Sequence, residues 1–116
     1  PLALTALALT LVGAGAVSAH TTVKSTNPKS GRTVSKSLKS VKVTFNGQIK
    51  RGTLKVVRSR TGAKVSKGSG GRNPGNVKQL TVRLKGGLKR GGYKASWSIV
   101  AADGHKQSGS FKFKLK

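Results

Sequence analysis

The sequence predicts an all-β protein, an antiparallel sandwich or barrel of about seven short strands. Three observations lead to this expectation. Apolar residues recur at every second position in several segments, turn residues separate these segments, and no segment shows the apolar spacing of an amphipathic helix. Alternation with a period of two turns one side of a strand toward the core and the other toward solvent.

Five segments show this alternation, and turn residues such as Asn46-Gly47 and Gly86-Gly87 follow them. The segments are 41–45, 53–58, 80–84, 93–101 and 111–115. Weaker strands are expected near 21–25 and 63–66. The stretch 67–76 is rich in Gly, Ser and Asn and is expected to be a flexible loop.

The predicted core is small, because the domain has few large apolar side chains. Its aromatic residues are Phe45, Tyr93, Trp97, Phe111 and Phe113. An aromatic side chain buries about 150–250 Å². We expect Trp97 to be the central core residue. The alternative is an exposed platform on which a substrate ring stacks.

Residues 1–19 have the composition of a signal peptide. They are uncharged, rich in Ala and Leu, and end in Val17-Ser18-Ala19. Small residues at −3 and −1 suit signal peptidase, so we expect cleavage after Ala19 and export of residues 20–116 as one domain. The alternative is a retained membrane anchor, because about 20 apolar residues span a bilayer. The domain is expected to be secreted, either periplasmic or extracellular and associated with the cell wall.

The chain contains two histidines and one acidic residue, and their placement predicts a metal site. His20 directly follows the expected cleavage site, and Asp103 and His105 flank Gly104. An N-terminal His offers its α-amino nitrogen and ring Nδ1 as a six-membered chelate. The reference pKa values, about 8 for an α-amino group and about 6.5 for His, leave modest proton competition near neutrality.

A second imidazole from His105 would complete three nitrogen donors, and Asp103 would add an oxygen and a negative charge. Nitrogen and oxygen donors in a tetragonal arrangement favour Cu(II) over Zn(II). The alternative is that Asp103-Gly104 only forms a tight turn. The two histidines would then be solvated side chains without a ligand.

Beyond these residues, nearly the whole of 20–116 resembles the CopC-type copper-resistance domain. The resemblance is most specific between Tyr93 and Phe113, which include Asp-Gly-His. The matching pieces are His20 after Val-Ser-Ala, Ser25-Thr26-Asn27-Pro28-Lys29-Ser30-Gly31, Val41-Lys42-Val43-Thr44-Phe45, Leu88-Lys89-Arg90-Gly91-Gly92-Tyr93, Trp97-Ser98-Ile99-Val100-Ala101-Ala102-Asp103-Gly104-His105 and Ser108-Gly109-Ser110-Phe111-Lys112-Phe113.

The resemblance implies a Greek-key antiparallel β-sandwich, immunoglobulin-like or cupredoxin-like. It implies one Cu(II) bound by the His20 amine and imidazole, Asp103 and His105. It also implies a part in copper storage, delivery or resistance, often beside a CopD-type membrane copper transporter. Some members add a Met-rich Cu(I) site, but this sequence has no Met, so Cu(II) alone is expected.

The copper hypothesis leaves the charge unexplained. The sequence holds 24 Lys and Arg residues against one acidic residue, a formal net charge of +23, and a positive field opposes Cu²⁺ capture. Such a balance predicts contact with a polyanion, namely anionic cell-wall polymer, lipid headgroups or nucleic acid. Sequence-specific nucleic-acid recognition is not expected, because no segment has the pattern of a reading helix.

Three function classes follow, and the first is favoured. It is a secreted Cu(II)-binding protein that is not an enzyme. The second is a basic polyanion-binding surface protein without a specific metal role. The third is a copper oxidase built on an N-terminal His, as in polysaccharide monooxygenases, but the sequence shows no aromatic sugar-binding face. No nucleophile–base–acid triad is available, and Gly68-Ser69-Gly70-Gly71 lacks the Lys-Ser/Thr ending of a phosphate-binding loop.

Overall fold

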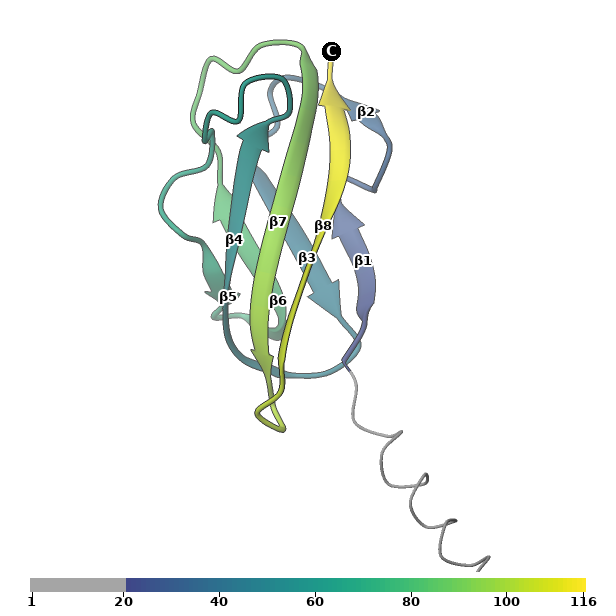
Figure 1. The fold of residues 1–116 in the computed structure, drawn as a ribbon, viewed down its shortest axis with the longest axis vertical. Helices are drawn as coiled ribbons and strands as arrows, with labels where there is room; N and C mark the ends of the chain where they lie inside the picture. Colours follow the sequence, from purple (N-terminus) through teal and green to yellow (C-terminus); the bar gives the residue numbers. More distant parts are fainter. Residues whose placement is uncertain (1–20) are drawn as a thin grey trace, which may run out of the picture.

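Two four-stranded sheets pack face to face in the computed structural model, which describes residues 21–116. Figure 1 shows β4, β7 and β8 in the front layer and β3 and β6 behind them. The strands are β1 (Val23–Asn27), β2 (Thr33–Val34), β3 (Ser40–Phe45), β4 (Ile49–Arg58), β5 (Gly71–Asn73), β6 (Asn76–Arg83), β7 (Gly91–Ala101) and β8 (Lys106–Leu115). The predicted Greek-key antiparallel sandwich is confirmed.

The strand order is β1-β3-β6-β5 in one sheet and β2-β8-β7-β4 in the other. All pairs are antiparallel except β2 with β8. The chain therefore changes sheet at every connection except β5–β6 and β7–β8. Among residues 21–116 there is no helix with the length and apolar character that crossing a membrane requires.

The alternation read from the sequence matches the burial in the structure. In β3, buried positions alternate with half-buried ones, and in β8 buried positions alternate with exposed ones toward the C-terminus. The inward side chains of both sheets form one core of Val41, Val43, Phe45, Ile49, Leu54, Val56, Leu80, Val82, Leu84, Tyr93, Ala95, Ile99, Phe111, Phe113 and Leu115. Burying one large aliphatic or aromatic side chain stabilises the fold by roughly 1.5–3 kcal/mol.

Trp97 is not the central core residue that the sequence predicted. It faces inward and pairs with buried Leu54 across β4 and β7, but it is only partly buried at the edge of the cluster. Its indole lies over Gly109 of β8, where a Cβ would come within 2.5 Å of Cζ2. Tyr93, Phe45 and Phe113 are the largest fully buried side chains, and the Phe45 ring meets Trp97 edge-on at 5.0 Å.

Two weaker expectations are also corrected. The segment 63–66 forms only isolated bridges, Val57 with Lys64 and Ser66 with Leu84. The stretch 67–76 contains β5, and its Ser69 carbonyl accepts a hydrogen bond from the Leu54 amide at 2.8 Å. Sequence composition indicated a loop there because the pairing residues of β5, Gly71, Arg72 and Asn73, have no apolar side chains.

The contact between Trp97 and Gly109 predicts that Gly109→Ala destabilises the protein. The added Cβ has no room beside the indole, and overpacking of this kind costs about 1–3 kcal/mol. Urea unfolding followed by the fluorescence of the single Trp measures the change. The control is Gly86→Ala, where no heavy atom lies within 4 Å of the new Cβ. Equal stability of the two variants would contradict the packing described here.

Candidate metal site

The turn between β7 and β8 carries the predicted ligands Asp103 and His105. The Ala101 amide donates to the His105 carbonyl at 2.8 Å, and the Gly104 amide donates to the Ala101 carbonyl at 2.9 Å. Gly104 has a φ of +93°, in a region that residues with a Cβ rarely adopt. The same three residues therefore form both a tight turn and a possible site, so the two interpretations of Asp-Gly-His do not exclude one another.

The Asp103 carboxylate holds His105 through both of its oxygens. Oδ1 accepts a hydrogen bond from the His105 backbone amide at 3.0 Å, and Oδ2 lies 2.9 Å from ring Nδ1. The His105 side chain is 64% exposed and that of Asp103 is 34% exposed. The backbone amide and then the ring of His105 lower the pKa of Asp103 below its ordinary value, so the carboxylate is ionised at neutral pH.

This bond decides which ring nitrogen suits a metal. Asp103 engages Nδ1, so an ion bound by His105 in this orientation would be held through Nε2. A carboxylate at the other ring nitrogen fixes the orientation of a metal-binding imidazole and raises its basicity. In this arrangement Asp103 orients His105. To bind the same ion, a carboxylate oxygen would have to leave Nδ1.

The start of the described chain is tied to the same end of the sandwich. Gln107 Nε2 donates to the Thr21 carbonyl at 2.6 Å, and the Thr21 amide donates to Gln107 Oε1 at 3.3 Å. Thr22 and Asn46 are linked by a second pair of bonds, each 2.9 Å long. Figure 1 shows the start of β1 and the β7–β8 turn at one end of the molecule.

His20 itself lies outside the described residues, as does the predicted signal peptide. His20 is covalently bound to Thr21, and Thr21 is hydrogen-bonded to the residue two positions after His105. Residues 21–116 hold no group of three His, Asp, Glu or Cys side chains that would bind a metal. They contain a single acid and a single His, and the remaining residue of these types in the printed sequence is His20.

Sequence reasoning missed Gln107 and Asn46, which hold the first described residues. The sequence holds a hint for Gln107 only. Gln107 is a polar residue at an inward position of the alternating strand, which indicates that its side chain has a hydrogen-bond partner. Its role depends on pairing with a segment 86 residues away, and alternation within one strand carries no information about that partner.

These features define a class: a small two-sheet β-sandwich with an Asp–His pair in the hairpin turn next to its N-terminal segment. A model of the CopC domain family matches residues 23–116. The chain belongs to the CopC domain family, and the resemblance read from the sequence is confirmed.

Known relatives and structures are similar to this chain to different extents. Protein YobA of Escherichia coli strain K12 is 44% identical over 45 residues, which are 39% of this chain and 36% of YobA. The match thus spans about a third of that relative. YobA of Shigella flexneri matches to the same extent.

Among solved structures, CopC from Methylosinus trichosporium OB3b superposes with a TM-score of 0.71 at 24% identity, over 84% of this chain and 94% of that one. PcoC, a methionine-rich copper resistance protein from Escherichia coli, superposes with a TM-score of 0.68 at 21% identity, over 84% of this chain and all of PcoC. At these identities the likeness establishes the fold.

The Asp103–His105 bonds predict an acid-side titration. Because folding lowers the pKa of Asp103 below 3.8, the unfolded chain binds this proton more tightly. The carboxylate therefore contributes stability above the unfolded pKa, and this contribution is lost as the pH falls through the folded pKa. The ¹³C shift of the Asp103 carboxyl carbon, followed by NMR against pH, should titrate below pH 3.8.

His105→Ala provides the control for this titration. It removes the ring but keeps the backbone amide, the larger cause of the shift. The pKa of Asp103 should rise in this variant yet stay below its ordinary value. An unshifted pKa in the native protein would contradict the hydrogen bonds of the turn.

Proposed function

We propose that the protein is a secreted Cu(II)-binding protein that serves copper storage, delivery or resistance. One Cu(II) is held by the His20 amine and Nδ1 and by His105 Nε2, and Asp103 supplies an oxygen ligand once its carboxylate turns from His105 Nδ1 to the ion. The observation that carries the proposal is the Gln107 clamp, because it fixes the residue after His20 beside the strand that follows His105. Membership of the CopC domain family and the likeness to copper resistance protein PcoC support the copper assignment.

The donor set favours Cu(II). Two imidazoles, one amine and one carboxylate supply nitrogen and oxygen ligands of the kind that Cu(II) takes in a tetragonal plane. Soft thiolate and thioether ligands select Cu(I), and the sequence contains neither Cys nor Met. The proposed role is binding and release of the ion rather than catalysis.

The site requires a free amine at His20, and this links function to export. Cleavage after Ala19 creates that amine, so the protein becomes a copper binder only after it leaves the cytoplasm, as a periplasmic or extracellular protein. The ion is the cargo. A CopD-type membrane copper transporter is the proposed partner in its transfer, since this role accompanies the family resemblance.

The amine ligand is tested by Cu(II) titration of protein beginning at His20, read by electron paramagnetic resonance. One equivalent should bind with a nitrogen-rich tetragonal spectrum. A matched protein with one Gly added before His20 should lose this spectrum, because the amine becomes an amide. Identical behaviour of the two proteins would overturn the proposed ligand set.

The Gln107 clamp predicts that Gln107→Leu weakens Cu(II) binding without removing a ligand. Loss of residues that orient metal ligands typically costs 10–100-fold in affinity, and a loss in this range is expected here. Competition with a Cu(II) chelator of known affinity measures it. Ser108→Ala is the control, since Ser108 is the exposed neighbour on the opposite side of β8. An unchanged affinity for Gln107→Leu would show that the clamp does not position the site.

A further inference from the structure

The two outer faces of the sandwich differ in charge. Strand register and burial place six cations on the outer face of the β2-β8-β7-β4 sheet: Arg51, Lys55, Lys94, Lys106, Lys112 and Lys114. The outward positions paired between β3 and β6 carry two, Lys42 and Arg83. We call the outer face of the β2-β8-β7-β4 sheet, with these six cations, the basic face.

Like charges lie directly opposite one another on the basic face. Lys94 of β7 pairs with Lys112 of β8, and Lys114 follows two residues later on the same side. Like charges at directly opposite positions destabilise a sheet. The single acid of the described residues, Asp103, lies in the β7–β8 turn and is bonded to His105. No carboxylate side chain of residues 21–116 therefore lies among these lysines, and an external anion would relieve their repulsion.

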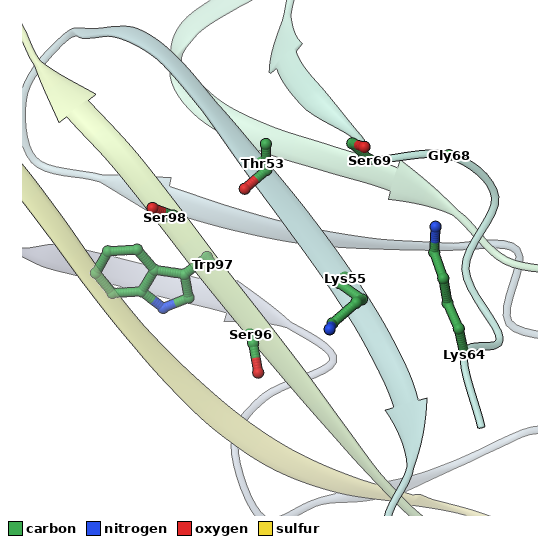
Figure 2. A pocket seen from close by; sticks show the side chains of 8 residues that line it. All are labelled: Thr53, Lys55, Lys64, Gly68, Ser69, Ser96, Trp97 and Ser98. Carbon is green, nitrogen blue, oxygen red and sulfur yellow. The ribbon is translucent and has the colours of Figure 1, made fainter. Parts of the chain in front are cut away.

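Hydroxyl groups form rows between the cations. Thr53, Ser98 and Ser108 are aligned across β4, β7 and β8, and Ser96 and Ser110 form the next row. A shallow hollow of about 300 Å³ lies on this side of β4 and β7. Figure 2 shows its lining side chains, which include these hydroxyls of β4 and β7 together with Lys55 and Lys64.

A second hollow, of about 280 Å³, lies at Gly92 and is lined by Ser59, Lys112 and Lys114 among others. It occurs because Gly92 has no side chain to fill the row between Ser59 and Lys114. The basic face thus offers two separate hollows, each with two lysines and with hydroxyl donors. This arrangement suits a chain of repeated anionic groups better than a single small anion.

The basic face is less suited to two other kinds of polyanion contact. Its outward positions carry no aromatic residue. The rings at the hollows, Trp97 at the first and Tyr93 and Phe113 at the second, belong to inward-facing residues that are at most partly exposed. Nucleic-acid bases therefore find little ring surface for the stacking that single-strand binding uses. The exposed large apolar residues of the described chain, Val23 and Val77, belong to β1 and β6 of the other sheet. The outward apolar residues of the basic face, Val57 and Val100, are only partly exposed. The basic face therefore offers few of the apolar anchors by which surface helices and lipid tails hold to a bilayer.

We propose that the basic face binds a flexible polyol–phosphodiester polymer of the cell surface. Lysine ammonium groups bind the phosphate charges, and Ser and Thr hydroxyls bond to phosphate oxygens and to the hydroxyls of the polymer. This interaction is independent of copper, because none of Lys94, Lys112 and Lys114 lies in the proposed metal site. It retains the exported protein at the cell surface.

The probe is poly(glycerol phosphate), with binding to the purified protein measured by calorimetry at several salt concentrations. The test variant replaces Lys94, Lys112 and Lys114 by Gln. The matched control replaces Lys24, Lys42 and Arg83 by Gln and so removes the same charge from the other sheet. For a flexible strand, each neutralised phosphate contributes about −0.7 to the slope of log K against log salt. Removal of three lysines should therefore make the slope less negative by roughly two and lower the affinity at least about tenfold.

The control variant should keep its affinity within about threefold and retain most of the salt slope. Equal losses in the two variants would overturn the proposal, because binding would then follow net charge rather than the basic face. Tighter binding to phosphatidylglycerol vesicles or to single-stranded DNA than to poly(glycerol phosphate) would also overturn it. Thermal unfolding checks that both variants fold, and relief of the Lys94–Lys112 repulsion should make the test variant at least as stable as the native protein.

Discussion

The paired hydrogen bonds between the Gln107 side chain and the Thr21 backbone join segments that are 86 residues apart, and the proposed copper site depends on them. Asp103 and His105 provide one carboxylate and one imidazole in an exposed turn, which is too few ligands to hold Cu(II) alone. The amine and ring of His20 complete the set only if the N-terminal segment reaches this turn. A single Gln side chain fixes that segment to the start of β8, because its amide nitrogen donates to the Thr21 carbonyl and its amide oxygen accepts from the Thr21 amide.

Period-two alternation was sufficient to predict the sandwich, because inward residues of β3, β6, β7 and β8 keep strict parity over their core-facing lengths, and β4 does so after the irregularity between Ile49 and Arg51. Alternation did not predict strands whose inward positions are not occupied by apolar side chains. Strand β5 is made of Gly71, Arg72 and Asn73, and Trp97 is displaced from the centre because its indole occupies the space above Gly109. Asp103 and His105 were proposed as ligands because acidic residues and histidines are scarce in the sequence. Gln107 was not identified, because a polar residue at one inward position does not reveal its distant partner.

The high positive charge of the protein repels the proposed cargo, Cu²⁺. The basic face and the β7–β8 turn with the proposed metal site are separate parts of the molecule, but only partly so. Cations on the basic face repel Cu²⁺, but screening limits this effect beyond roughly 8 Å at physiological ionic strength. Lys106 adjoins His105, so the field is not absent from the turn, and the ionised Asp103 offsets it locally. A bound phosphodiester polymer would neutralise the basic face and lower the repulsion that Cu²⁺ meets on approach. The charge that opposes metal capture by the isolated protein can thus be compatible with capture at the cell surface.

The central claim is that His20 joins Asp103 and His105 around one ion at the end of the sandwich. A crystal structure of the Cu(II)-loaded protein beginning at His20 tests it most directly. The account predicts one Cu(II) bound by the His20 amine, His20 Nδ1 and His105 Nε2, with the Asp103 carboxylate adjacent and the Gln107–Thr21 bonds intact. Copper bound through His105 Nδ1, or held elsewhere without the His20 amine, would contradict it.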